Sequence, residues 1–129
     1  MTIKVSIDAS GGDFGFSVTI NAGINALNTY DDLLINFVGD EAEIKKELKN
    51  NSLSSKFTDR IVITHASEVI NMDDSPSLAL RHKKDSSMRV AINLVKSGET
   101  DACVSAGNTG ALISIARFVL KTIKGVDRP

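Results

Sequence analysis

The sequence has 129 residues, 42% of them hydrophobic, which is enough apolar material for one compact domain with a buried core. Its 15 Lys and Arg residues are balanced by 16 Asp and Glu residues, so overall charge gives no argument for nucleic acid as a partner. The single cysteine, Cys103, excludes an internal disulfide, and no leader or long apolar span is visible, so we expect a cytoplasmic protein.

The first part of the chain predicts two strand–helix units. Residues 3–8 alternate between apolar and polar side chains and end in a glycine-broken turn, which indicates a strand. The apolar positions of residues 17–27 fit a helix with Ser17 as its expected N-cap. Residues 33–38 form a nearly continuous apolar run, typical of a strand buried on both faces of a parallel sheet. Asp40 then begins a helix as its N-cap.

The second part of the chain continues this alternation. A polar loop over residues 50–56 leads to a strand at 61–65, and a helical turn or two follows Pro76. Ser86 and Ser87 precede an apolar face of 3.6-residue period, and Gly98 ends that helix. A strand at 102–105 and a helix at 112–120 complete the pattern.

The last predicted helix is apolar almost all the way round. We therefore expect protein to cover most of its surface, either within the layer that covers the sheet or across a dimer interface. The chain then stops where an α/β pattern ordinarily delivers its next strand, so we interpret it as a single α/β domain, residues 1–129, that is the leading piece of a longer protein.

Four alternations of strand and helix favour an α/β fold, with a doubly wound, mainly parallel sheet between helices on both faces. In such a sheet, ligands bind beyond the carboxyl ends of the strands. Three predicted segments share that edge and could form one cleft. The first carries Asp8, Gly11, Gly12 and Asp13, the second is the turn at residues 105–110, and the third is Ser86 and Ser87 at the start of a helix that runs back toward the sheet.

The turn at residues 105–110 joins an apolar strand directly to a helix. The first amides of that helix lack intrahelical partners and, together with the helix dipole, form an anion site. Gly107 and Gly110 permit positive φ and close backbone approach, and Asn108 or Thr109 can cap the helix or hold a ligand oxygen. An ordinary capped turn between strand and helix explains the same spacing.

A third candidate segment begins the helix after residue 86. Lys83, Lys84 and Arg89 flank Ser86 and Ser87, so hydroxyls, helix amides and cations could converge on a phosphate or another oxyanion. The alternative is a solvated basic face beside a capped helix. The two aspartates of the first turn would repel a phosphate unless a basic group intervened, and they either orient Lys84 or Arg89 or cap the turn.

The sequence contains no motif for a metal site, a nucleotide site or a cysteine nucleophile. His65 and His82 are isolated and there is one cysteine, so no metal site is expected. The glycines match neither a Walker A run nor G-x-G-x-x-G, and we expect no cofactor. Cys103 lies in an apolar strand without an adjacent base, which favours a small buried hydrophobic role over a nucleophile.

Three blocks, residues 8–13, 84–91 and 102–111, resemble the bacterial phosphate acyltransferase family, whose members use acyl carrier protein and phosphate. Their order and separation fit along all 129 residues. Two positions depart from the family pattern, which usually has Met at Ser10 and Pro at Phe16. Neither departure removes a charged or phosphate-facing group, so they affect the local turn geometry most.

The resemblance implies that inorganic phosphate attacks the thioester of long-chain acyl carrier protein and yields an acyl phosphate. It also implies a fold like that of isocitrate and isopropylmalate dehydrogenases, a homodimer, and a product passed to a membrane glycerol-phosphate acyltransferase, with peripheral contact to the membrane. Members of the family are two to three times longer than this chain. Two other interpretations of the chain are that it is an inactive folded or dimerising fragment, or that it is a module that binds a phosphorylated metabolite.

Such an enzyme must hold phosphate against a thioester carbonyl and stabilise an oxyanion, and helix-end amides suit both tasks. The thiolate is a good leaving group, so no strong general acid is required. The catalytic candidates are Asp8, Asp13, Lys84 and Asn108. The predicted phosphate and substrate site consists of Gly11, Gly12, Ser86, Ser87, Arg89, Ser105, Gly107, Asn108, Thr109 and Gly110.

Overall fold

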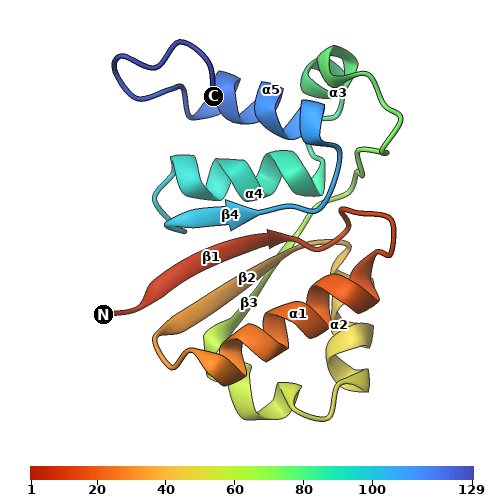
Figure 1. Ribbon diagram of the computed structural model, residues 1–129. Helices are drawn as coiled ribbons and strands as arrows, with labels where there is room; N and C mark the ends of the chain where they lie inside the picture. Colours follow the sequence, from red (N-terminus) through yellow and green to blue (C-terminus); the bar gives the residue numbers. More distant parts are fainter.

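The computed structural model describes all residues from Met1 to Pro129 and contains one four-stranded sheet in the order β3-β2-β1-β4 (Figure 1). Every strand pair is parallel, which confirms the expected sheet. The strands are β1 (Ile3–Asp8), β2 (Leu33–Gly39), β3 (Ile61–His65) and β4 (Ala102–Val104). Their carboxyl ends lie at one edge of the sheet, as parallel pairing requires.

Five α-helices and one 3-10 helix connect and cover the strands. They are α1 (Phe16–Thr29), α2 (Glu41–Asn50), η1 (Ser54–Arg60), α3 (Pro76–His82), α4 (Ser87–Lys96) and α5 (Thr109–Val119). None of them combines the length and apolar composition that a membrane span needs.

Two local expectations in the first half of the chain were wrong. The helix α1 begins at Phe16 with Gly15 as its N-cap, so Ser17 lies inside the helix, and its hydroxyl donates to the carbonyl of Phe14. The polar stretch at 50–56 is not one loop, because the Ser54 hydroxyl donates to the carbonyl of Leu48 and starts η1. Polar side chains there organise turns that apolar periodicity does not reveal.

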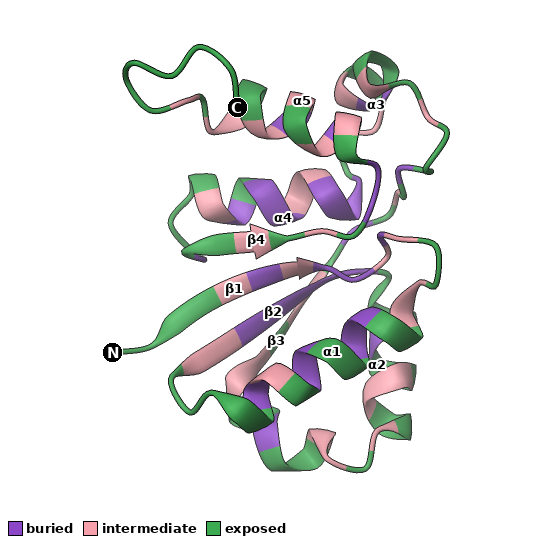
Figure 2. Cartoon of the chain, in the orientation of Figure 1, coloured by how far each residue is buried: buried purple, intermediate pink, exposed green.

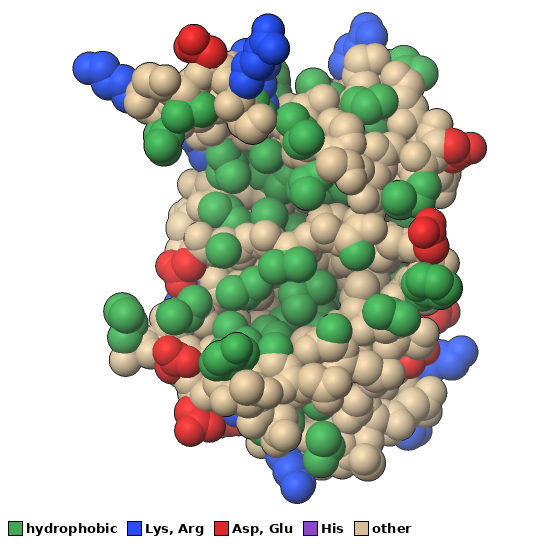
Figure 3. All heavy atoms as spheres, in the orientation of Figure 1, with side chains coloured by type: hydrophobic (Ala, Val, Ile, Leu, Met, Phe, Trp, Pro, Cys, Tyr) green, Lys and Arg blue, Asp and Glu red, His purple; other side chains and the backbone are tan.

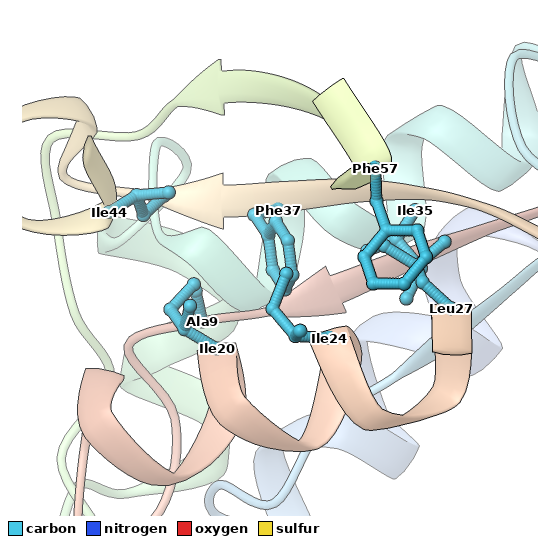
Figure 4. Close-up of a cluster of buried hydrophobic side chains, with 8 residues drawn as sticks. All are labelled: Ala9, Ile20, Ile24, Leu27, Ile35, Phe37, Ile44 and Phe57. Carbon is cyan, nitrogen blue, oxygen red and sulfur yellow. The ribbon is translucent and has the colours of Figure 1, made fainter. Parts of the chain in front are cut away.

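The helices α1 and α2 cover one face of the sheet. Their apolar side chains meet those of β2 in the main core, where aromatic and aliphatic groups interlock (Figure 4). Gly23 of α1 lies so close to β2 that a Cβ on it would stand 2.5 Å from the Phe37 ring. The buried members of this core are Ala9, Ile20, Ile24, Leu27, Ile35, Phe37, Ile44 and Phe57.

Helix α4 covers the opposite face of the sheet, and its buried side chains point in two directions. Ala91 and Leu94 pack towards the sheet, whereas Met88 and Ile92 face α3 and α5. The two outer helices therefore form a second core with α4. α5 packs on α4, and α3 packs on α5, as a further layer on that side (Figure 1).

The expectation that protein covers most of α5 is met only in part within this chain. Ala111 and Ile115 are fully buried, but Ile113 is 46% exposed and Phe118 is 56% exposed. Figure 2 shows this mixture of buried, intermediate and exposed residues along α5. Ile113 and Phe118 are five residues apart, so their side chains diverge by about 140° around the helix and belong to different surfaces.

Candidate functional site

A buried carboxylate, that of Asp8, connects the turns at the carboxyl ends of the central strands. It is 1% exposed at the end of β1. Its Oδ1 accepts hydrogen bonds from the Ser87 hydroxyl at 2.5 Å and from the Gly11 amide at 3.1 Å. Its Oδ2 accepts a hydrogen bond from the Ser105 hydroxyl at 2.7 Å. One side chain thus binds the β1–α1 loop, the start of α4 and the β4–α5 turn.

The two serine hydroxyls are oriented by this carboxylate. A hydroxyl has a single proton, and both Ser87 and Ser105 direct theirs at Asp8. Their remaining lone pairs accept, and the Ser105 oxygen accepts from the Gly107 amide at 3.1 Å. In this arrangement the hydroxyls position the turns, and the donors left for an anion are backbone amides.

Close backbone contact brings the two loops together. A Cβ on Gly11 would stand 2.5 Å from Asp8 Oδ2 and 3.2 Å from the Gly107 nitrogen. Gly12 has φ 95° and lies against the carbonyl of Ala106. These positions need glycine because larger residues would separate the loops.

Asn108 caps α5 and also ties it to a distant loop. Its Oδ1 accepts from the Ala111 amide at 3.1 Å, which confirms its expected capping role. Its Nδ2 donates to the carbonyls of Asn71, Met72 and Asp74. The side chain is therefore fully engaged within the protein, as its 7% exposure indicates.

The first amides of α5 are the free donors of the site. Thr109 is exposed and Gly110 half-buried, and neither amide has an acceptor within the chain. Gly107 and Gly110 do not use the positive φ that glycine permits, since neither residue is among those with left-handed backbone. The close approach at Gly110 is real, but it is to Pro76, whose Cγ would stand 2.8 Å from an added Cβ.

A second helix start, which the sequence analysis missed, lies beside this turn. Gly15, at φ 66°, begins α1 without a side-chain cap, so the first amides of α1 also lack partners. They adjoin a hollow of about 220 Å³ lined by Gly11, Gly12, Asp13, Phe14, Gly15, Val18, Thr19 and Ala106. The signal was three glycines within five residues directly before a helical pattern.

The composition of this hollow limits what it can bind alone. Asp13 is exposed at its rim and accepts no hydrogen bond within the chain. Phe14 and Val18 supply exposed apolar surface. No Lys or Arg lines it, so the only positive potential from its own residues is that of the helix amides.

The predicted cations point elsewhere. Ser86 is buried, and its hydroxyl caps α4 by accepting from the Arg89 amide. Arg89 follows Ser87 by two residues, which turns its side chain about 200° around the helix, away from the sheet. Its guanidinium lies 5.5 Å from the centre of the Phe118 ring and, with Lys84, lines a different hollow. Phe118 is nine residues beyond Thr109, about 13 Å along α5.

Cys103 is a half-buried thiol with little nucleophilic character. Burial raises its pKa, and the negative charge of Asp8 raises it further. Both effects favour the protonated form, which is a poor nucleophile. The side chain packs between the two smaller cores on the α4 side of the sheet.

A family profile described as "Fatty acid synthesis protein" matches residues 3–129. The chain is 68% identical over 129 residues to the "Phosphate acyltransferase" of Ruthia magnifica subsp. Calyptogena magnifica, covering 100% of this chain and 38% of that protein. It is similar to the proteins of the same name from Vesicomyosocius okutanii subsp. Calyptogena okutanii, at 64% identity, and Francisella philomiragia subsp. philomiragia, at 56%, each with the same coverage. The chain thus spans 38% of the length of these curated relatives.

Proposed function

Because the chain belongs to the fatty acid synthesis protein family, we propose that it forms part of a phosphate acyltransferase. The reaction transfers a long-chain acyl group from the thioester of acyl carrier protein to inorganic phosphate. The product is an acyl phosphate, which a membrane glycerol-phosphate acyltransferase consumes in phospholipid synthesis. The names of the relatives support transfer to phosphate, and the donor and the pathway follow from the family resemblance.

The observation that carries this proposal is the pair of unpaired amides at the start of α5. The Thr109 and Gly110 N–H groups have no acceptor, and the helix dipole adds positive potential at the same point. Asp8 fixes the preceding turn through Ser105, so these amides are held in place before an anion arrives. We assign the phosphate to this helix end.

With the phosphate at α5, we place the acyl thioester beside the start of α1. A phosphate oxygen attacks the carbonyl carbon, the new C–O bond forms, and the C–S bond breaks as its electrons leave with the thiolate. The hollow next to Gly12 and Ala106 offers free α1 amides for the carbonyl oxyanion and the apolar side chains of Phe14 and Val18 for the first methylenes. Asp8 is a positioning residue in this scheme, because its oxygens are occupied by serines and a glycine amide.

The rest of the enzyme must complete the site. No cation of this chain lines the hollow, so we propose that a basic group from the remaining length of the protein neutralises the phosphate. We also propose a homodimer that acts in the cytoplasm with peripheral membrane contact. The exposed Ile113 on α5 and Val104 on the edge strand β4 provide apolar surface for further protein to cover.

The test uses the full-length protein and removes one amide hydrogen. Thr109 is the first residue of α5, where proline fits the helix but lacks an N–H. Thr109→Pro should lower kcat/KM for phosphate by about 10- to 100-fold, the loss of one charge-assisted hydrogen bond of roughly 1.5–3 kcal/mol. The matched control, Thr109→Ala, keeps the amide and should stay within about twofold of the parent.

Each outcome is decisive. If Thr109→Pro melts like the parent and keeps its kcat/KM for phosphate, α5 does not hold the phosphate. If the parent protein forms no acyl phosphate from acyl carrier protein thioesters, the proposed reaction is wrong.

A further inference from the structure

Two hollows meet at Phe118 on the outer side of α5. The first, about 270 Å³, is lined by Leu80, Arg81, Lys84, Arg89 and Phe118. The second, about 470 Å³, is lined by Ser114, Arg117, Phe118, Lys121 and Thr122. They share Phe118, and we call the surface that contains both hollows, across α3, the start of α4 and the end of α5, the basic groove. Figure 3 shows Lys and Arg side chains around α5 and the following segment.

The cations of the basic groove have no carboxylate partner. The chain has two salt bridges, Lys45–Glu41 and Lys83–Asp74, and neither involves a residue that lines the groove. No Asp or Glu lines either hollow. Because the whole chain has a net charge of -1, this concentration of positive charge polarises the molecule.

Arg89 is held ready to donate at the floor of the groove. Its Nε is buried and has no acceptor, and its Nη1 makes only a long contact of 3.5 Å to the carbonyl of Leu80. Arg89 lines the groove and forms no ion pair, so its outer guanidinium N–H groups are available to an oxyanion.

Lys121 occupies an unfavourable backbone conformation at the groove. It follows the C-cap of α5 and has φ 67°, the one non-glycine residue of the chain with positive φ. Glycine is the usual residue at this helix-ending position because a side chain is strained there. The lysine ammonium lies 5.2 Å from the centre of the Phe118 ring, which also interacts with the Arg89 guanidinium at 5.5 Å.

We propose that the basic groove docks an acidic protein surface, which under the proposed function is an acidic face of the carrier that brings the thioester; this assignment rests on that function. The groove spans two hollows and three helices, which exceeds the footprint of one phosphate group. A bilayer surface fits less well, because only two of the side chains that line the groove, Leu80 and Phe118, are large and apolar, too few for an inserting face. Carboxylates on a partner would pair with the groove cations, and Phe118 would supply an apolar contact.

The first experiment reverses two exposed groove charges in the full-length protein. Arg81→Glu with Arg117→Glu should raise the Kd for labelled acyl carrier protein by about tenfold at low salt, with kcat within about twofold. The difference should shrink at about 0.5 M salt. The matched control is Lys46→Glu with Lys49→Glu on α2, which makes the same charge change at the opposite end of the molecule (Figure 1).

A second variant separates docking from folding. Lys121→Gly relieves the strained backbone and removes one groove cation, so it should melt at a higher temperature and bind the carrier about threefold more weakly. Lys121→Arg keeps both the charge and the strain, and should match the parent in both measurements.

The results distinguish this proposal from its alternatives. Equal effects of the groove and α2 charge reversals on carrier binding would overturn it. The proposal would also be overturned if the groove variant lost binding to phosphatidylglycerol vesicles but bound the carrier like the parent, because the groove would then contact the membrane. If the groove variant forms acyl phosphate and binds the carrier with the affinity of the parent, the docking proposal is wrong and the proposed function stands. Groove-dependent carrier binding without acyl phosphate formation by the parent overturns the proposed function.

Discussion

Gly110 lies directly against Pro76, so that an added Cβ would stand 2.8 Å from the proline Cγ. This contact joins the first turn of α5 to the first residue of α3. The proline ring is rigid and cannot rotate away as a flexible side-chain end would. The missing side chain at this position therefore serves the packing of two helices, while the Gly110 amide stays without an acceptor in the chain.

Gly110→Ala should accordingly lower stability. Overpacking costs about 1–3 kcal/mol, which exceeds the gain of up to about 1 kcal/mol from replacing glycine in a helix. Denaturant unfolding measures the loss. In a Pro76→Ala background the obstructing Cγ is gone, and Gly110→Ala should become neutral or stabilising. Equal losses in both backgrounds would show that the contact with Pro76 is not the cause.

Asp8→Asn should damage both stability and phosphate use. The asparagine offers one oxygen, so at least one of the hydroxyls of Ser87 and Ser105 faces an amide donor, at a cost of about 1–3 kcal/mol. Release of the turn should also lower kcat/KM for phosphate about tenfold or more.

The matched control for Asp8→Asn lies on the same face of β1. Ser6 is fully buried, and its hydroxyl donates to the carbonyl of Ala91, away from the candidate site. Ser6→Ala should cost stability without changing kcat/KM for phosphate. If both variants reduce phosphate use equally, Asp8 acts through general stability and not by positioning.

Acid should loosen the loop that Asn108 holds. The carboxylate of Asp74 accepts hydrogen bonds from the Lys83 ammonium and the Asn71 amide. These bonds keep the pKa of Asp74 below its ordinary 3.8. A lowered folded-state pKa means that the stabilisation is complete above pH 3.8 and is lost as pH falls through the folded-state pKa.

Hydrogen exchange of residues 69–76 measures this loosening. Protection should fall as pH drops below 3.8, after correction for the intrinsic rate. Asp74→Asn should show reduced protection already at neutral pH and little further response to acid. A parent-like acid response in Asp74→Asn would assign the effect to another carboxylate, such as Asp85, whose pKa is lowered by hydrogen bonds from Ser67.

Residues 1–129 alone should not form acyl phosphate at a useful rate. The strand β4 has a free edge with Val104 57% exposed, so the site beside it stays open to water, and substrates are not clamped. We expect at least about a hundredfold less activity than the full-length protein. Comparable turnover by the two would show that this chain holds every necessary group.

The strands and most helix caps, the N-cap of α1 excepted, were predictable because their signals are local. The apolar runs placed each strand to within one residue, and Asp40 caps α2 through the Glu43 amide as its spacing indicated. Gly98, at φ 82°, follows the end of α4 as expected. In each case the residues that make the interaction are close in sequence, so spacing alone defines their geometry.

The candidate site was harder to predict because its contacts are long-range. The meeting of Asp8 with Ser87 and Ser105 follows from the shared edge of parallel strands, and proximity was expected on that ground. The two-residue spacing from Ser87 already turns Arg89 away from the sheet, but its contacts with Leu80 and Phe118 depend on where α3 and α5 pack, which no local pattern specifies. The same holds for Asn108, whose amide reaches a loop more than thirty residues earlier.

The central place of β1 also affects how the chain folds during synthesis. Its first neighbour, β2, pairs from Leu33 onward, but its second neighbour, β4, begins only at Ala102. At about 5–20 residues per second, the ribosome needs roughly 3–13 seconds to go from the end of β2 to the start of β4. During that interval one edge of β1 has no partner in its own chain and can recruit a strand from a neighbouring nascent chain. Chaperone capture of ribosome-bound intermediates should therefore be concentrated in this window of translation.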